Sequence, residues 1–458
     1  MDNKLSLTFW SGVGSVTGAN FLLECNKTRI LVDCGLMQGT PEADTENRKK
    51  FPYDPKTIDF LFATHSHMDH IGRICKLVKD GFSGVIYSTP ETKELALVML
   101  QDAIKVMEMN RREQNLAPLY GPEDLDKAMS LWQTISYHDT KKVSDSVSVL
   151  VKDAGHILGS AMYEFSCAGN SKKETKILFT GDSGNSPSPL LKDTESIAGV
   201  DYLVMDSVYG DRNHEPKDVR DERFKTIVEE TIHAGGTLVI PAFSLERTQV
   251  VLYELNNLIE DKKIPSVPVY LDSPLGEKVT EIYKHSTENF NEAVQSEIKG
   301  GDDIFNFPKL FITHGFKDSE DIEYHLNSKI IIAGSGMSSG GRVVGHETKF
   351  LPDPKATVLL MGYQAPGTLG RQIENKPSQV EINDAMIPIR ARIEMITGFS
   401  SHKDSDHLVQ MVEETAETVK KVFVVMGEPK SSTFLVQRLQ NELSVSAEYP
   451  KRGILYTL

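Results

Sequence analysis

The chain has 458 residues and a formal net charge of −15, with 39% hydrophobic and 25% charged residues. This is the composition of an ordinary globular protein, and the length allows two or more domains, each with its own core. Proteins that hold nucleic acid mainly through its backbone usually have a basic surface, so the negative charge alone does not decide the substrate.

Several classes of protein are excluded by what the sequence lacks. No apolar run approaches the roughly 20 residues that span a bilayer, so we expect no membrane partner. The first residues have no basic segment followed by an apolar core, as a secretory signal would have. The cysteines lie far apart without a C-x-x-C pair, against a disulfide framework or a thiolate zinc site: Cys25, Cys34, Cys75 and Cys167. We therefore expect a cytoplasmic protein.

The first part of the chain is predicted to form short strands joined by tight turns, followed by helices. Strands are expected at 5–10, 20–25, 29–33 and 58–63. Helical periodicity begins at Ile71 and stops near Gly81, and Pro90 opens a long helix to about Arg112. A second helix follows Pro122. Strands are then predicted at 147–151, 162–165, 177–179 and 202–205.

From Tyr209 onward, helices and strands alternate regularly. Helices are expected at 218–233 and 246–259, and strands at 237–240, 267–271, 310–313, 329–333 and 357–361. Apolar strands alternating with amphipathic helices predict a mostly parallel sheet covered on both faces. The tail is predicted to contain strands at 388–396, 422–426 and 454–456, and helices from about 406 and near 434–443.

The segment His65-Ser66-His67-Met68-Asp69-His70 follows directly after a predicted strand. Imidazole and carboxylate are the ligands that a catalytic Zn²⁺ accepts while one position stays open for water. His65 and His67 lie two residues apart and can face one metal ion, whereas Asp69 and His70 can face a second. The alternative is a polar loop with scattered histidines. It is disfavoured because the chain has only 13 histidines, and three of them lie within these six residues.

Four further segments share one form, a strand followed by a small residue or turn and then a potential ligand. These ligands are Asp33, His156, Asp182 and Asp206. One such residue alone is usually a turn or a helix cap. Their joint occurrence with the histidine segment predicts that they converge at the strand ends, where ligands usually bind.

Together these motifs resemble the metallo-β-lactamase superfamily, and they stand in family order along the first half of the chain. The resemblance implies an α/β fold, a four-layered αββα sandwich, with two Zn²⁺ ions. Asp33 would orient the site from behind the ligands. The first ion would be held by His65, His67 and His156, the second by Asp69 and His70, and Asp182 would bridge both.

The second half of the chain resembles the β-CASP branch of that superfamily, closest to its RNA-processing nucleases. The resembling segments are 206–211, 241–243, 271–275, 334–342 and 398–402. The resemblance implies a metallo-β-lactamase domain at 1–208, a β-CASP cap with a parallel sheet flanked by helices at 209–390, and a return to the first domain at 391–458. The implied catalytic residues are Asp69, Asp182, Asp206 and His402, with His402 held by Asp206 as a general acid.

One position departs from the family pattern. RNA-processing members carry a histidine before Gly-Glu that binds the second metal, and this chain has Met426 there. A thioether replaces imidazole poorly on Zn²⁺, so we expect weak occupancy of the second site. DNA-directed members carry an apolar residue at this position. His407 is the one nearby substitute, although we expect it on a helix surface.

These features predict a zinc-dependent ribonuclease with RNA as its partner. They do not decide whether cleavage is internal or from an end, or whether the protein forms a homodimer. The alternatives are a DNA- or small-ester-directed metallo-hydrolase, or a catalytically weakened RNA-binding scaffold. Phosphate contacts are expected from loops of small polar residues and arginine, although structural use of these loops is an equal alternative: Ser338, Ser339, Arg342, Ser400 and Ser401.

Overall fold

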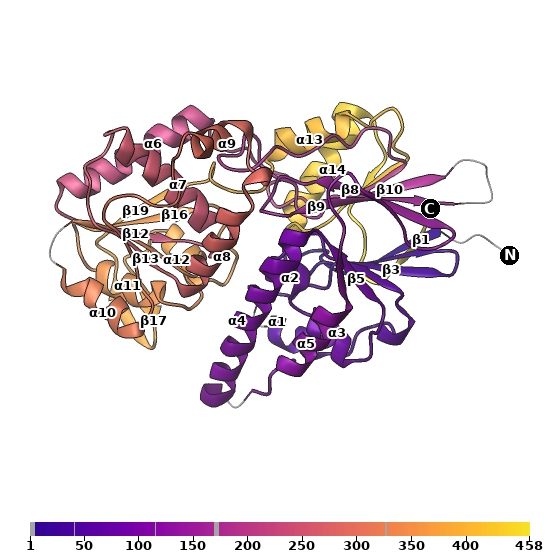
Figure 1. Ribbon diagram of the computed structural model, residues 1–458, viewed down its shortest axis with the longest axis horizontal. Coiled ribbons are helices and arrows are strands. Elements are labelled where there is room, and N and C mark those ends of the chain that lie inside the picture. The colour runs from indigo at the N-terminus through magenta and orange to yellow at the C-terminus, as the bar shows by residue number, and fades with distance from the viewer. Residues whose placement is uncertain (1–4, 41, 115, 169–173, 326–327) are drawn as a thin grey trace. The chain divides into compact units, whose positions relative to one another are not determined.

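The computed structural model describes residues 5–40, 42–114, 116–168, 174–325 and 328–458 (Figure 1). The chain divides into two compact units. The first consists of Met1–Asn213 and His402–Leu458, and the second of His214–Ser401. None of the described helices combines the length and the apolar character that crossing a bilayer requires.

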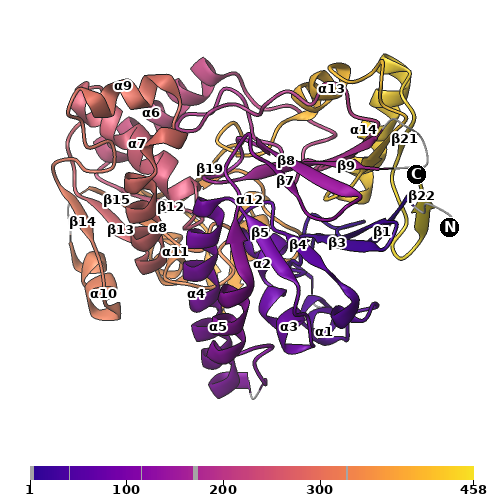
Figure 2. The ribbon, with the colours of Figure 1, turned by 45° about the vertical axis from the view of Figure 1, so that its right-hand side comes forward.

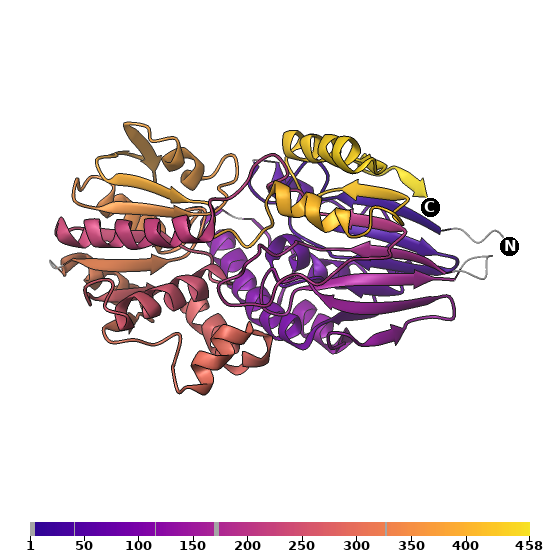
Figure 3. The ribbon, with the colours of Figure 1, turned by 90° about the horizontal axis from the view of Figure 1, so that it is seen from above.

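The first unit contains two facing sheets of seven strands each. The first sheet has, in spatial order, β22 (Leu455–Thr457), β1 (Leu5–Ser11), β2 (Asn20–Cys25), β3 (Thr28–Val32), β4 (Phe60–Phe62), β5 (Val85–Ser88) and β6 (Trp132–Thr134). The second has β21 (Ala447–Glu448), β20 (Lys421–Val424), β11 (Tyr202–Met205), β10 (Thr175–Phe179), β9 (Ala161–Cys167), β8 (Val147–Asp153) and β7 (Thr140–Lys142). The last strand, β22, lies antiparallel beside the first, β1 (Figure 3).

A core of alternating apolar residues fills the space between these two sheets. In β8, Val147, Val149 and Val151 are buried, whereas the residues between them are half-buried. They pack with aromatic side chains from both sheets, including Phe62 and Phe165, whose rings meet edge to face at 5.0 Å. Side chains two apart on a strand share a face, and this period places the apolar set inward.

Helices cover the outer face of each sheet, which completes an αββα sandwich (Figure 2). The first sheet is covered by α3 (Ile74–Lys79), α4 (Pro90–Gln114) and α5 (Pro122–Leu131), and the second by α13 (Ser405–Glu413) and α14 (Pro429–Leu443). Short helices complete the unit: α1 (Ala43–Arg48), η1 (Pro55–Thr57) and α2 (Met68–Ile71).

The second unit is built on one parallel sheet of six strands. In spatial order these are β14 (Leu310–Ile312), β13 (Val269–Asp272), β15 (Lys329–Ala333), β12 (Thr237–Pro241), β16 (Thr357–Met361) and β19 (Arg392–Ile396). Every residue of β12, β13, β15 and β16 is buried, as expected for a parallel sheet covered on both faces.

Helices alternate with these strands along the chain, and Figure 1 shows α6 on one side of the sheet and α11 on the other. The helices are α6 (Lys217–His233), α7 (Arg247–Glu260), α8 (Pro274–His285), η2 (Thr287–Asn289), α9 (Glu292–Lys299), α10 (Phe316–Tyr324), α11 (Val343–Phe350) and α12 (Leu369–Glu374). A hairpin of β17 (Gln379–Ile382) and β18 (Ala385–Pro388) precedes the last strand. The predicted fold class, an αββα sandwich with a helix-flanked parallel sheet, is confirmed.

Two predicted elements are wrong in detail. The strand predicted at 388–396 is divided, because the N–H groups of Arg390 and Ala391 both donate to the carbonyl of Leu351 instead of to a neighbouring strand. The helix predicted from Ile71 to Gly81 is also divided, into α2 and α3. Arg73, between them, donates its N–H to the carbonyl of Cys34, so the helical hydrogen-bond ladder is interrupted there.

We predict that Gly35→Ala destabilises the first unit, because the two backbones meet closely at this residue. A Cβ atom at Gly35 would lie 1.5 Å from the carbonyl oxygen of Asp69, so one of the segments must move. The free energy of unfolding should fall by about 2–4 kcal/mol, measured by urea unfolding with circular dichroism. Gly121→Ala is the control, since nothing lies within 4 Å of the added carbon, and it should cost less than about 1 kcal/mol. Equal losses in both variants would contradict the predicted clash.

Candidate metal centre

The site lies where strands of the two facing sheets end. Strands β3 and β4 run parallel, as do β10 and β11, so their carboxyl ends meet at one edge of the sandwich. Asp33 follows β3, His65 follows β4, Asp182 follows β10 and Asp206 follows β11. His156 lies in the turn between β8 and β9. The prediction that the ligands follow strand ends therefore agrees with the structure.

Backbone pairing holds the histidine segment in place. The N–H groups of Cys34 and Leu36 donate to the carbonyls of His70 and Met68, at 2.7 and 2.9 Å, and the N–H of Ala19 donates to the carbonyl of Asp69 at 2.9 Å. The loop from His65 to His70 is thereby docked against the segment that follows Asp33. Its side chains consequently start from a fixed backbone.

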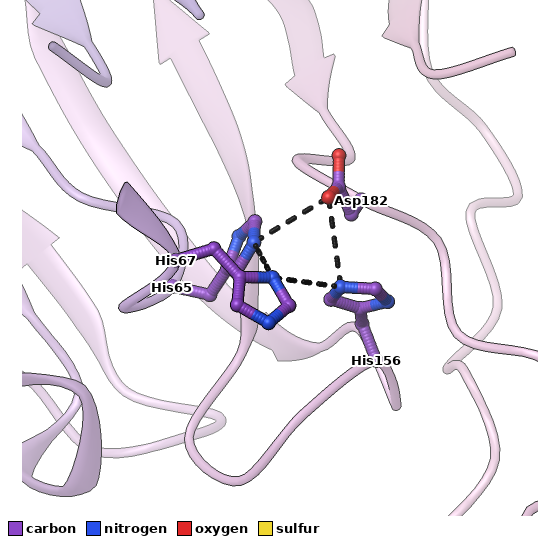
Figure 4. A group of neighbouring side chains, drawn as sticks. All are labelled: His65, His67, His156 and Asp182. Carbon is purple, nitrogen blue, oxygen red and sulfur yellow. Dashed lines mark hydrogen bonds and ion pairs between the residues drawn. The ribbon is translucent and has the colours of Figure 1, made fainter. Parts of the chain in front are cut away.

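Four side chains bring one ligand atom each to a common point (Figure 4). The Nδ1 atom of His67 lies 3.0 Å from Nε2 of His65 and 3.3 Å from Nε2 of His156. One carboxylate oxygen of Asp182, Oδ2, lies 3.4 Å from Nε2 of His65 and 3.5 Å from Nε2 of His156. All four atoms lie within 4.8 Å of one another.

These spacings fit a tetrahedral metal ion. Ligand atoms about 2.0–2.1 Å from an ion at the centre of a tetrahedron are about 3.3 Å apart, from the tetrahedral geometry of such sites. The four measured separations, 3.0 to 3.5 Å, bracket that value. Burial lowers the pKa of His67 and of His156 well below the ordinary value, so both imidazoles are neutral near pH 7, the form that binds metals.

The other carboxylate oxygen of Asp182 faces a second group. Its Oδ1 atom lies 3.3 Å from Nε2 of His70, and Nε2 of His70 lies 3.9 Å from Oδ2 of Asp69. Oδ1 of Asp182 and Nε2 of His70 are both buried, and within the described residues neither forms a hydrogen bond. Buried polar atoms are normally satisfied, so these two atoms are candidate ligands for a second cation.

The hydrogen bonds of Asp33 indicate which ring nitrogen carries the proton in His70 and in His65. Its Oδ2 atom lies 2.7 Å from Nδ1 of His70 and accepts the hydroxyl of Thr64 at 2.8 Å, and its Oδ1 accepts the N–H of Thr64 at 2.8 Å. Because a carboxylate accepts, Nδ1 of His70 carries the proton and Nε2 presents its lone pair. The Thr64 hydroxyl, having donated to Asp33, accepts from Nδ1 of His65 at 3.0 Å, which frees Nε2 of His65 in the same way.

Thr64 is a positioning residue that sequence reasoning missed. Its only signal was its place between the apolar strand and the first histidine. Asp33 itself has a left-handed backbone, with φ of 61°, which non-glycine residues adopt rarely and which concentrates at functional sites. Its orienting role stays a prediction, which these contacts motivate.

His402 joins the site from the segment that returns to the first unit. Its Nδ1 atom lies 3.6 Å from Oδ2 of Asp206 and 4.0 Å from Oδ2 of Asp182, and its ring centroid lies 4.6 Å from that of His156. The other oxygen of Asp206 accepts the N–H of Ser183 at 3.0 Å. Burial opposes the charged form of His402, but Asp182 and Asp206 outweigh it and raise the pKa of this imidazole.

Met426 is buried in the apolar core of the first unit, together with residues such as Phe9 and Phe21. Its N–H donates to the carbonyl of Gly12 at 2.8 Å, and a Cβ atom on Gly12 would lie 2.7 Å from the sulfur of Met426. His407, the other candidate at this site, lies on α13, where its Nδ1 contacts Asp404 at 2.7 Å. Because Met426 lies among apolar residues, its sulfur contributes to the packing of the core.

The candidate phosphate contacts belong to the second unit, where the side chains of Arg342 and Ser338 form short hydrogen bonds. Arg342 donates to Oδ1 of Asp272 at 2.6 Å and to the carbonyl of His314 at 2.8 Å. Ser338 is buried and donates its hydroxyl to Glu347 at 2.5 Å, where burial raises the pKa of Glu347 to about 8.

The remaining serines differ in exposure: Ser339 is exposed, Ser401 half-buried and Ser400 buried. Ser400 donates its N–H to the carbonyl of Thr397 at 2.8 Å. The phosphate-binding role of these loops stays a prediction.

We predict that Asp33→Asn weakens metal binding, because the amide can donate to Nδ1 of His70 and thereby reverse the imidazole tautomer. Loss of such a carboxylate behind a ligand typically costs 10- to 100-fold in metal affinity, roughly, and the test is metal content after dialysis against graded chelator. Asp201→Asn is the matched control, a buried carboxylate that accepts the N–H of Lys176 at 2.9 Å. Unchanged metal retention in Asp33→Asn would refute the orienting role.

Comparisons with known proteins agree with this geometry. Family models match residues 22–195 as a metallo-β-lactamase superfamily domain, 248–373 as a β-CASP domain, and 386–450 as a Zn-dependent metallo-hydrolase RNA specificity domain. A crystal structure of a protein of unknown function from Enterococcus faecalis matches with a TM-score of 0.54 at 14% identity, covering 99% of this chain and 100% of that one. That likeness supports the fold alone.

Curated relatives match over most of their length. A ribonuclease of Thermus thermophilus is 33% identical, over 87% of this chain and 88% of its own. An RNase J-like protein of Methanocaldococcus jannaschii is 30% identical, over 98% of this chain and 99% of its own. The cleavage and polyadenylation specificity factor 73 of Drosophila melanogaster is 29% identical, over 95% of this chain and 62% of its own. The chain therefore belongs to the metallo-β-lactamase superfamily, in the branch whose members carry a β-CASP domain.

Proposed function

We propose that the protein is a zinc-dependent ribonuclease that hydrolyses phosphodiester bonds of RNA. The observation that carries the proposal is the convergence of three imidazoles and one carboxylate on a point with tetrahedral spacing. The match to an RNA specificity domain and the similarity to a ribonuclease support RNA as the substrate. We place the cap at 209–390, as the sequence predicts.

Zinc is the metal that this donor set suits best. Imidazole nitrogens with a carboxylate oxygen in tetrahedral array are typical zinc ligands, and a catalytic zinc keeps a position open. When bound, zinc supplies a water whose pKa lies near 7 and polarises the phosphoryl oxygens. His65, His67, His156 and Asp182 would hold the first ion, and Asp69, His70 and Asp182 the second.

The chain's own groups perform the remaining steps. Asp182 directs one carboxylate oxygen toward each cluster, so it would fix the spacing of two cations. His402 has a side chain that is 20% exposed, so a substrate can reach its ring, and the nearby carboxylates of Asp182 and Asp206 favour its protonated form. His402 would therefore donate a proton to the leaving ribose oxygen.

Met426 favours one alternative, a catalytically weakened member that binds RNA as a scaffold. A buried thioether at this position leaves the second cation site with Asp69, His70 and Asp182 as its protein ligands. Three protein ligands still suffice for a catalytic zinc, and the other predicted ligands are present in the described residues, so we favour the active enzyme. A homodimer and a cytoplasmic location stay predictions.

We predict cleavage of RNA, rather than matched DNA, by the zinc-loaded protein, and loss of cleavage with chelator. The measurement uses 5′- and 3′-labelled oligonucleotides, whose product ladders also distinguish internal cleavage from cleavage at an end. His402→Ala should slow RNA cleavage by roughly 10²- to 10⁴-fold, as expected for loss of a general acid, while zinc content stays unchanged.

The matched control is His138→Ala, because His138 is 72% exposed and pairs with Glu195. It should cleave at the wild-type rate. Chelator-resistant cleavage, or a His402→Ala variant as fast as wild type, would overturn the assignment. Complete inactivity of zinc-loaded wild type with preserved RNA binding would support the scaffold.

We predict that Met426→His increases retention of a second zinc, because imidazole is a far better zinc ligand than a thioether. In wild type, a brief wash with chelator should leave about one zinc per chain, measured by elemental analysis, since the second site has fewer protein ligands. The variant should retain closer to two. Met426→Leu, which keeps the apolar packing, is the control and should behave like wild type. Two firmly held ions in wild type would contradict the prediction.

A further inference from the structure

A pocket in the first unit is lined by cations and aromatic rings, and its lining includes none of the candidate metal ligands. It has a volume of about 530 Å³ and lies among the N-terminal strands, the end of α1 and the turn before β22. Its charged and aromatic lining includes Trp10, Lys49, Lys50, Phe51, Arg73 and Arg452. Four of its lining residues are basic and one, Glu46, is acidic, in a chain with 50 basic and 65 acidic residues.

Arg73 is the lining residue best placed to hold an anion. It is only 7% exposed, and its guanidinium donates to the carbonyl of Gly35 at 2.5 Å and to the hydroxyl of Ser11 at 3.1 Å. Both oxygens are uncharged, and no carboxylate of the described residues forms an ion pair with Arg73. A buried charge is costly unless an opposite charge compensates it, so this guanidinium has capacity for an anion from outside the chain.

The other basic side chains that line the pocket have only one carboxylate partner among the lining residues. Lys49 and Arg452 both pair with the carboxylate of Glu46, the latter at 3.3 Å. Lys50 is exposed. By contrast, Lys76, whose Nζ lies 4.4 Å from the ring centre of Phe51, is neutralised by Asp80 at 2.6 Å. The pocket therefore keeps an excess of positive charge close to its buried arginine.

An aromatic side chain completes the lining. Trp10 forms one wall, with its ring 5.8 Å from that of Tyr53, and its backbone carbonyl accepts from Arg452 at 2.7 Å. Within the described residues its indole N–H is buried and has no acceptor. Aromatic walls bind nucleobases by stacking, while arginine and lysine bind phosphate.

We propose that this pocket binds a nucleoside monophosphate, with its phosphate on Arg73 and the lysines and its base against Trp10. The volume lies within the range of small-ligand pockets. Arg73 also connects the pocket to the metal centre, because it holds the carbonyl of Gly35, whose backbone packs against that of Asp69. The inference concerns a different site from the proposed nuclease centre and does not depend on its activity.

The chain offers a local reporter for this pocket. It has two tryptophans, and Trp132 is buried and donates its indole N–H to Ser88 at 2.8 Å. A Trp132→Phe background leaves Trp10 as the single tryptophan, so its fluorescence reports on the pocket. The zinc-loaded protein in this background is titrated with uridine monophosphate, adenosine monophosphate, uridine and inorganic phosphate.

We expect a saturable change in Trp10 fluorescence with either monophosphate, and at least about tenfold weaker effects of uridine or inorganic phosphate. Lys49→Ala/Lys50→Ala should weaken monophosphate binding at least about fivefold and make it less sensitive to salt. Lys127→Ala, an exposed lysine on α5, is the control and should change nothing.

Three results would overturn the proposal. Inorganic phosphate binding as tightly as the nucleotides would show a simple anion site without base recognition. Nucleotide binding without a fluorescence change, or unaffected by Lys49→Ala/Lys50→Ala, would place the nucleotide elsewhere. Because Lys49 and Lys50 lie outside the metal centre, failure of this proposal leaves the nuclease assay unaffected.

Discussion

The carboxylate of Asp33 is the contact that ties together the candidate metal ligands. It receives the imidazole N–H of His70 directly and orients His65 through the hydroxyl of Thr64. A histidine can offer a lone pair at only one nitrogen, and the hydrogen bond at the other nitrogen selects which one. One buried acceptor therefore sets the tautomers of two imidazoles, one in each cluster. Thr64 donates to both carboxylate oxygens of Asp33, whose backbone has a positive φ.

The αββα sandwich explains how ligands far apart in sequence reach one place. Parallel neighbours in each sheet bring their carboxyl ends to the same edge, and the two sheets face each other across one apolar core. Asp182 and Asp206 come from one sheet, and Asp33 and His65 from the other. The returning segment adds His402, which is tied to the site region by the hydrogen bond from the N–H of Lys403 to the carbonyl of Ser183.

Met426 occupies a position where RNA-processing members carry a histidine, and here its side chain is buried in the core. The loop after β20 presents this residue with a positive φ of 47°, next to Gly12, and its sulfur lies in the core. A thioether gains stability there by burial, about 1.5–3 kcal/mol for a side chain of this size. The structure therefore shows Met426 as a packing residue of the core.

Much of the architecture could be predicted from the sequence, because hydrophobic periodicity is a local property. The strands at 20–25, 202–205, 329–333 and 357–361 have the predicted limits, and the ligand motifs were recognisable because each follows an apolar run. The strand at 388–396 failed because two N–H groups donate to Leu351, a partner that no local pattern encodes. Likewise, the sequence named Asp33 and His70, but only the fold shows that one orients the other. The pairing of Arg342 with Asp272 and the burial of Arg73 against the carbonyl of Gly35 are tertiary facts as well. The sequence alone determined which residues can bind a metal. The tertiary structure decided which atoms face one another, because distance and burial between remote segments depend on how the sheets pack.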